Sequence, residues 1–281
     1  MVCSYVLFYC RNAASFFAQK YDIYHVFDKI WNIYFLKLLF KQQNGLINYL
    51  CTMKVTAYSC DVQSCFLCTL CLPEWLPAIS SNKQNRQYKK GEQLFEEGSE
   101  ARGIYFLYKG VVKVHKRWGE DKQLILHFAK QGDMIGYRGL GNDRRYPVTA
   151  TALENSIVCF VDIRFFEATL QVNHQLTYSL MQFYANELQA AELRMRNLAH
   201  MEVKGRIAEM LLMLQKNFGK NNDGSLNISL SRRDMASYCG TTYETIFRVI
   251  NELKKEGIIQ ISGKNIMIDK GDKLAELRNR K

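Results

Sequence analysis

The chain has 281 residues, which is long enough for two domains with separate hydrophobic cores. Its formal net charge is +11 and its isoelectric point is near 9.2, a balance that favours a polyanionic partner such as nucleic acid. Three prolines and the absence of low-complexity runs and internal repeats argue against a linker-rich or repeat protein.

Residues 1–52 form an atypical N-terminal extension rich in Tyr, Phe, Cys and Asn. Its opening apolar run is short and lacks a basic leader, which argues against a signal peptide. Charged residues interrupt the apolar stretch over 23–40, whereas a membrane-spanning helix needs about 20 mostly apolar residues. We therefore expect no membrane span, with a surface-lying helix as the alternative. We expect translation to start at Met53, so that the extension is not made.

Residues 53–88 form a cysteine-rich segment. Cys60, Cys65, Cys68 and Cys71 lie within twelve residues. Thiolates are ligands for iron, and four of them can also bind zinc, although such short spacings crowd a tetrahedral site. The same cysteines could be redox-active thiols or plain free thiols, whereas structural disulfides are rare in the cytosol.

Residues 89–173 are expected to form an antiparallel barrel or sandwich. Short β-rich runs alternate there with glycines and charged turns, which is typical of such folds. The expected strands are Leu94–Phe95, Ile104–Tyr108, Val111–His115, Leu124–Phe128, Val148–Ala152 and Ile157–Val161.

Residues 174–200 predict one long helix, because they contain neither proline nor glycine. Two apolar series recur there every seven residues and alternate at three- and four-residue spacing, as the a and d positions of a coiled coil do. This pattern favours a twofold homodimer over a helix buried within one subunit. The two series are Met181, Leu188 and Met195, and Tyr184, Ala191 and Leu198.

Residues 201–281 are expected to form a winged helix-turn-helix, a unit that places one helix in the major groove of DNA. A helix over 203–218 should join the core of this unit, since its apolar positions recur at helical spacing. Ser231 and Asp234 predict the start of the next helix, close to a capping box. Gly240 lies where the following turn needs a positive φ.

The second helix of the helix-turn-helix pair would read the DNA. Thr241 and Glu244 form a capping box that predicts its start. Glu244 and Arg248 project side by side, where a carboxylate can accept from cytosine N4 and a guanidinium can bind guanine; an ordinary surface ion pair is the alternative. A hairpin over 258–268 follows, with Lys264 at its tip near phosphate. We expect DNA contacts from Thr242, Tyr243, Glu244, Phe247, Arg248 and Lys264.

The run GTTYETIFR, residues 240–248, resembles the recognition-helix signature of the cyclic-AMP receptor protein and fumarate–nitrate reduction regulator (Crp/Fnr) family. The runs KKGEQLFEEG, YFLYKGVVKV and KQGDMIG resemble its cyclic-nucleotide-binding β-roll, so the likeness covers most of the chain after about residue 60. In that family a Glu and an Arg four residues later read the DNA, which implies Glu244 and Arg248 here. Tyr243 and Phe247 depart from the family's residues, which leaves the half-site sequence open.

The resemblance implies an α+β fold with an N-terminal antiparallel β-roll, a long dimerisation helix and a C-terminal winged helix-turn-helix. It also implies a cytoplasmic homodimer that reads a near-palindromic site in double-stranded DNA, with RNA polymerase as a further partner. A signal at the sensor would align or misalign the two recognition helices by shifting populations. No nucleophile–base pair, metal-binding His motif or phosphate loop is present in the sequence, so we expect no enzyme.

A cyclic nucleotide is not expected in the β-roll. Family members that bind one carry a Gly-Glu pair and, further on, an Arg-Ser or similar pair. Here Tyr137 follows Gly136 in place of the Glu, and Arg144 and Arg145 precede Tyr-Pro, where Pro147 lacks an amide donor. We therefore expect no cyclic AMP. Gly136, Tyr137, Arg144 and Arg145 form a candidate effector pocket for a small anionic metabolite. The alternative is that the two arginines belong to a solvated basic loop.

The residues of this region resemble the fumarate–nitrate branch more closely, and that branch binds no nucleotide there. That branch senses oxygen with a cubane iron–sulfur cluster held by three N-terminal cysteines and one from the β domain. The resemblance implies Cys65, Cys68, Cys71 and Cys159 as ligands, with Cys60 as an alternative. The spacing C-x4-C-x2-C-x2-C departs from the branch pattern C-x2-C-x5-C, which leaves the third ligand open. Cys159 also fits a small hydrophobe in a buried strand.

Overall fold

A computed structural model of the chain describes residues 65–119 and 122–279. The expectations for the extension over 1–52, for a start at Met53 and for Cys60 fall outside these residues.

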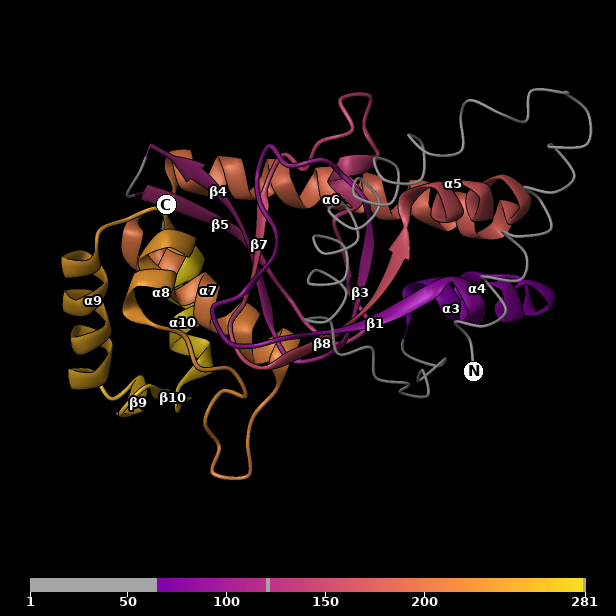
Figure 1. Cartoon of the computed structure of the whole chain (residues 1–281). Coiled ribbons are helices and arrows are strands. Elements are labelled where there is room, and N and C mark those ends of the chain that lie inside the picture. Colours follow the sequence, from indigo (N-terminus) through magenta and orange to yellow (C-terminus); the bar gives the residue numbers. More distant parts are fainter. Residues whose placement is uncertain (1–64, 120–121, 280–281) are drawn as a thin grey trace, which may run out of the picture. The chain divides into compact units, whose positions relative to one another are not determined.

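Two four-stranded antiparallel sheets form a β-roll in the described part of the chain (Figure 1). Their strands are β1 (Lys83–Tyr88), β2 (Gln93–Phe95), β3 (Gly103–Lys109), β4 (Val112–Trp118), β5 (Lys122–Ala129), β6 (Met134–Ile135), β7 (Thr149–Ala152) and β8 (Ser156–Asp162). One sheet has the order β1-β8-β3-β6 and the other β2-β7-β4-β5. All six strands expected from the sequence are present, with ends that differ by a few residues.

The first sheet begins earlier than residue 89, because β1 pairs along its whole length with β8, from Lys83 opposite Val161 to Tyr88 opposite Ser156. The sequence of β1, KQNRQY, carries no apolar alternation. Its position at the edge of the sheet explains this composition, since polar side chains are tolerated there. The other strand without a sequence signal, β6, has only two residues.

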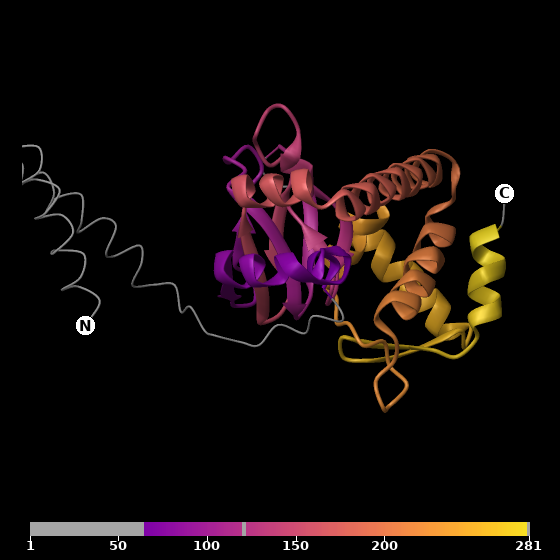
Figure 2. The same cartoon turned by 90° about the vertical axis from the view of Figure 1, so that its right-hand side faces the viewer.

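Helices cover one side of the roll (Figure 2). They share an apolar cluster with the roll that includes Phe106, Phe166, Leu176 and Leu180. The cluster therefore joins the cysteine-rich segment, the roll and the first turns of the long helix. The elements that contribute are α3 (Phe66–Leu70), η1 (Pro73–Trp75), α4 (Leu76–Asn82), α5 (Ile163–Val172) and α6 (His174–His200).

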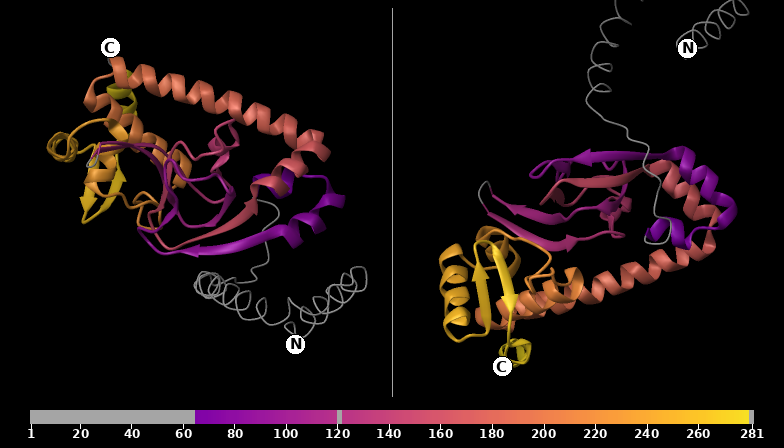
Figure 3. Two further views of the ribbon diagram at one scale, coloured as in Figure 1. Left: turned by 45° about the horizontal axis from the view of Figure 1, so that its top comes forward. Right: turned by 90° about the horizontal axis from the view of Figure 1, so that it is seen from below.

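The long helix α6 has the predicted bounds, 174–200. Figure 3 shows it running from the end of the roll that carries α3 to α5 toward the C-terminal unit. Leu176 and Leu180, in its first two turns, are buried against the roll, whereas most of the later turns are exposed along one side.

The C-terminal unit is a winged helix-turn-helix. It consists of α7 (Val203–Phe218), α8 (Arg232–Cys239), α9 (Tyr243–Lys255), the hairpin of β9 (Ile259–Ser262) and β10 (Asn265–Ile268), and α10 (Gly271–Asn279). The buried face of α9 consists of Ile246, Val249, Ile250 and Leu253, as helical spacing predicts. Burying each such side chain stabilises the unit by roughly 1.5–3 kcal/mol. The terminal helix α10 had no sequence prediction; Leu274 and Leu277 bury it in the same core.

None of the helices in the described residues is both long and apolar enough to span a bilayer.

Candidate nucleic-acid interface and sensor region

The start and end of α8 agree with the sequence prediction. Ser231 caps the helix, because its Oγ accepts from the backbone N–H of Asp234 at 3.0 Å. Gly240 ends the helix at φ +61°, in the left-handed region. A Cβ at Gly240 would lie 2.8 Å from Leu198 Cδ2, so a side chain there is disfavoured by both the backbone and the packing.

The predicted cap of α9 was wrong by one residue. Thr242, not Thr241, is the N-cap, and its Oγ1 accepts from Thr245 N at 3.3 Å. Two adjacent threonines offer the same cap chemistry, and the tight turn after Gly240 leaves the second one in the extended conformation that a cap requires. Glu244 therefore lies in the first turn of the helix. Its own backbone N–H and the Thr242 hydroxyl hold the pKa of that carboxyl below its usual value.

One face of α9 is exposed along its first two turns. Tyr243, Glu244, Phe247 and Arg248 all lie there, opposite the buried face. Arg248 donates to Glu252 at 3.1 Å, one turn further on, rather than to Glu244. Glu244 and much of the Arg248 fork are thus left exposed, as a base-reading pair needs. The side chain of Lys264 is exposed in the turn between β9 and β10.

The residues of the candidate effector pocket bond to different partners. The Tyr137 hydroxyl donates to Glu187 of α6, and Arg138 donates to the same carboxylate at 3.3 Å. Burial raises the pKa of Tyr137. Arg144 forms an ion pair with Glu167, and Arg145 donates to Gly98 O at 2.7 Å. Gly136 precedes Tyr137 with φ +87°. The four residues predicted for the pocket are therefore near one another in sequence but already have separate contacts.

Aromatic side chains pack into the roll beside this region. The Tyr146 hydroxyl donates to Gly103 O at 2.6 Å and accepts from Gly103 N at 3.1 Å. Its ring stacks on Phe95 with centroids 3.9 Å apart. A Cβ at Gly136 would lie 3.2 Å from the Tyr146 ring and one at Gly139 would lie 3.1 Å from it. The tyrosine thus fills the space beside Gly136 and Gly139.

The structure gathers four of the predicted cysteine ligands in one buried cluster. Cys65, Cys68, Cys71 and Cys159 all lie there, against the roll and the start of α6. The Cys71 thiol donates to Asn173 Oδ1 at 3.1 Å, and burial raises the pKa of this thiol. Four thiols are the donor set that an iron–sulfur cluster takes. As placed, however, no three His, Cys, Asp or Glu side chains of the described residues are arranged to hold a metal ion.

A set of contacts between the roll and α8 had no sequence signal. Lys113 of β4 forms an ion pair of 2.7 Å with Asp234 of α8, and both side chains are largely buried. Ser237 donates to Gln123 O at 2.8 Å and accepts from Ile125 N at 3.1 Å. The β4–β5 hairpin is thereby fixed to α8, the first helix of the helix-turn-helix.

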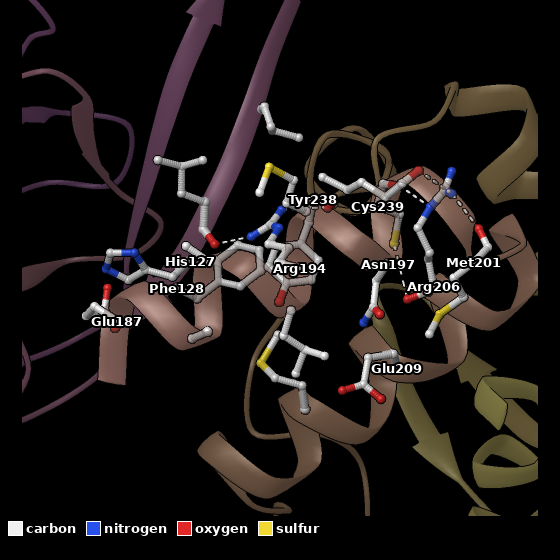
Figure 4. Close-up of a pocket in the computed structure, with 18 of the residues that line it drawn as sticks. His127, Phe128, Glu187, Arg194, Asn197, Met201, Arg206, Glu209, Tyr238 and Cys239 are labelled. Atoms are coloured by element: carbon white, nitrogen blue, oxygen red, sulfur yellow. Dashed lines mark hydrogen bonds between the residues drawn. The ribbon is translucent and has the colours of Figure 1, made fainter. Parts of the chain in front are cut away.

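Arg194 of α6 joins the same two elements (Figure 4). It donates to the carbonyls of Ile125 and Leu126 and, at 2.8 Å, to Tyr238 O. Its guanidinium lies 4.2 Å from the Tyr238 ring centroid. Leu126, Arg194 and Tyr238 line a pocket of about 520 Å³ between β5, α6 and the DNA-binding unit. Cys239, at its edge, is buried, and burial raises the pKa of its thiol to about 12.

Comparison with known proteins decides the family. Residues 85–173 match the cyclic nucleotide-binding domain, and residues 205–277 match the Crp-like helix-turn-helix domain. The anaerobic regulatory protein of Bacillus subtilis is 31% identical over 201 residues, which are 70% of this chain and 83% of that protein. The chain belongs to the Crp/Fnr family of transcription regulators.

Two further relatives support this assignment. The fumarate and nitrate reduction regulatory protein of Escherichia coli K12 is 25% identical over 223 residues, which cover 76% of this chain and 89% of that one. The structure of FixK2 from Bradyrhizobium japonicum has a TM-score of 0.65 and 26% identity, and it covers 71% of this chain and 98% of its own. The predicted α+β fold, the DNA-binding regulator class and the exclusion of an enzyme are confirmed.

Proposed function

We propose that this Crp/Fnr regulator acts as a homodimer that reads a near-palindromic site with two copies of α9. The observation that carries the proposal is the exposed apolar stripe of α6. Met181, Leu188 and Met195 recur every seven residues and are 59%, 61% and 66% exposed. Large apolar side chains at heptad spacing on a 27-residue helix are typical of a coiled-coil seam. Twofold pairing would place the recognition helices about one DNA turn apart.

In this proposal the exposed face of α9 supplies the base contacts. Glu244 accepts from a cytosine and Arg248 donates to a guanine in the major groove. Lys264 contacts a phosphate from the wing and adds affinity that is independent of sequence. The regulator works on cytoplasmic DNA with RNA polymerase as its further partner.

We also propose that Cys65, Cys68, Cys71 and Cys159 hold an iron–sulfur cluster that sets the activity, which requires their thiols to turn toward one another from the placement described above. Their burial in one cluster supports this proposal. When bound, such a cluster would supply an oxygen-sensitive group. The chain itself provides a route to α6, because Asn173 at the N-cap of this helix accepts from both Cys71 Sγ and Leu72 N, the latter at 2.9 Å. A rearrangement of the thiols would therefore change the hydrogen bonds of Asn173 at the start of α6.

The alternative signal, a small anionic metabolite at Arg144 and Arg145, has less support. The first guanidinium is paired with Glu167 and the second with a backbone carbonyl, so an anion would have to displace both partners.

The test combines anaerobic purification with selection of DNA sites from a random library. We expect iron and sulfide bound to the protein, a dimer in solution and an enriched inverted repeat. The absence of bound iron and sulfide after anaerobic purification would contradict the cluster proposal. Enrichment of single, unpaired half-sites would contradict the paired recognition helices.

A further inference from the structure

We propose that Tyr243 and Phe247 read the C5-methyl groups of thymines next to the base pair that Glu244 and Arg248 contact. This inference rests on the proposed function and names the bases that its recognition helix prefers.

The first support is the exposure of the two rings. Within the described residues from 201 to 279, Tyr243 and Phe247 are the large hydrophobic side chains that are exposed, at 46% and 54%. The rings lie nearly parallel, with centroids 6.4 Å apart and an interplanar angle of 16°. Two neighbouring aromatic rings left in water on an otherwise well-buried unit indicate a binding surface.

The second support is the position of the rings around the helix. Successive residues of an α-helix are turned by about 100°. Tyr243 and Phe247 therefore occupy one flank of the exposed arc of α9, and Glu244 and Arg248 occupy the other. When the charged flank faces one base pair in the groove, the aromatic flank faces the neighbouring ones.

The third support is the chemistry of the groove. Thymine presents a methyl group at the edge that faces the major groove, and phenylalanine contacts with this methyl are an established form of base recognition. The patch consists of two side chains, which is far less than the roughly 800 Å² per partner that a stable protein interface buries. Its flanking acid and base suit hydrogen bonding to base edges, so DNA fits the whole face better than a protein does.

The experiment replaces thymine by uracil in the site selected by the full-length chain, one position at a time in both half-sites. Uracil differs from thymine only by the missing methyl, so its hydrogen bonds are preserved. We expect the dissociation constant to rise by about fourfold per methyl at the contacted positions, the value of one buried methylene. Phe247→Ala or Tyr243→Ala should abolish this uracil effect at one position each and leave it at the other.

Two controls separate this effect from a general loss of binding. Trp118→Ala removes another exposed aromatic side chain, on β4 and outside α9, and should retain the full uracil effect. Tyr243→Phe keeps the ring and should also retain it. Trp118→Ala should also leave the affinity for random DNA unchanged.

Three results would overturn the inference. The first is a wild-type chain whose affinity does not change with uracil at any position. The second is a uracil effect in Phe247→Ala and Tyr243→Ala that equals the wild-type effect at every position. The third is a selected site without thymine beside the base pair that Glu244 and Arg248 contact. In each of these cases a selected inverted repeat would leave the proposed function standing. A chain that selects no site at all would overturn both.

Discussion

Arg248 is the residue on which sequence discrimination should depend most. Its guanidinium is exposed and contacts one carboxylate, that of Glu252, so donors are left for guanine. We expect Arg248→Ala to weaken binding to the selected site by about 5- to 150-fold, the value of one bidentate base contact, with little change on random DNA. Titrations against both DNAs measure the ratio. Equal losses on the two would contradict a base-reading role.

Lys264 provides the matched contrast, because it is a single exposed cation on the wing. Lys264→Ala should weaken binding to selected and random DNA by the same factor. It should also reduce the slope of log K against log salt by about one, since one phosphate contact is lost. A change in sequence preference would contradict this role.

His115 should make the stability depend on pH. Its side chain is buried and its Nε2 lies 3.0 Å from Thr151 Oγ1. Burial, followed by the positive charges of Lys113 and Arg117, lowers the pKa of His115 to about 4, and this outweighs the opposing carboxylates of Asp234 and Glu97. Between pH 6.5 and 4 the unfolded chain therefore binds a proton that the folded chain does not. As the pH is lowered from 6.5 to 4, the free energy of unfolding therefore decreases by up to about 3 kcal/mol. Protonation of His115 has no further effect below pH 4.

Urea unfolding at several pH values measures this dependence. His115→Gln should flatten the slope between pH 6.5 and 4, while His174→Gln, an exposed histidine, should leave it unchanged. His127 contributes in the same window, since burial lowers its pKa to about 4 as well, so part of the slope should persist. An unchanged slope in His115→Gln would refute the prediction.

For single residues, the sequence predicts which side chains face the DNA better than it predicts the exact cap residue or hydrogen-bond partner. The face of α9 follows from helical spacing, and the exposed Glu244 and Arg248 are where that spacing puts them. The cap moved from Thr241 to Thr242 because neighbouring threonines are equivalent in composition and only the turn geometry separates them. The sequence could not predict which carboxylate Arg248 contacts, because Glu244 and Glu252 are both four residues away from it.

Among the elements, the contact between β4 and α8 is the feature with the clearest energetic consequence. Lys113 and Asp234 are 14% and 13% exposed, so removing either charge leaves the other poorly solvated. We expect a coupling of about 1–2 kcal/mol in a double-mutant cycle of Lys113→Met and Asp234→Asn, measured by urea unfolding. Because burial limits screening, the coupling should persist at high salt.

The exposed pair of Glu100 and Arg102 is the control for this cycle. Its side chains are 72% and 71% exposed, and such pairs contribute little to stability. A cycle of Glu100→Gln and Arg102→Gln should give a coupling close to zero. If the Lys113–Asp234 coupling is no larger than this, the contact does not join the roll to the DNA-binding unit energetically.

Most elements follow from local sequence, and the exceptions have physical reasons. The bounds of α6 and α7 were predicted because both helices are strongly periodic and lack internal proline. The edge strand β1 was missed because its stability comes from pairing with β8, a partner more than sixty residues away, rather than from an apolar pattern of its own. The contact of β4 with α8 was missed for the same reason, since Lys113 and Asp234 are separated by 121 residues.

For the whole molecule, motif order predicted the family and the succession of roll, long helix and DNA-binding unit. The sensor is less predictable. Spacing brings four cysteines into one segment and one strand, and the fold buries them together, but the direction of each thiol depends on the packing of α3 against α6. The bond from the Cys71 thiol to Asn173 joins residues 102 apart in the sequence, so no local pattern predicts it.

The dimer is a property of the whole molecule, and α6 allows a direct test of it. Leu188 is 61% exposed in the single chain and would be buried twice in a twofold seam. Leu188→Glu therefore removes roughly 3–6 kcal/mol of apolar burial and sets two carboxylates against each other. Light scattering should show monomers at micromolar concentration, and binding to the inverted repeat should fall to the level of a single half-site.

Gln189→Glu is the control for this change, because it introduces the same charge one residue further along α6, on a position outside the seven-residue series. It should leave the chain dimeric. Circular dichroism should show that both variants keep their helices, since neither side chain is buried in the single chain. A dimer of unchanged affinity in Leu188→Glu would mean that the exposed stripe of α6 serves another partner, and the recognition helices would then have to be paired by a different surface.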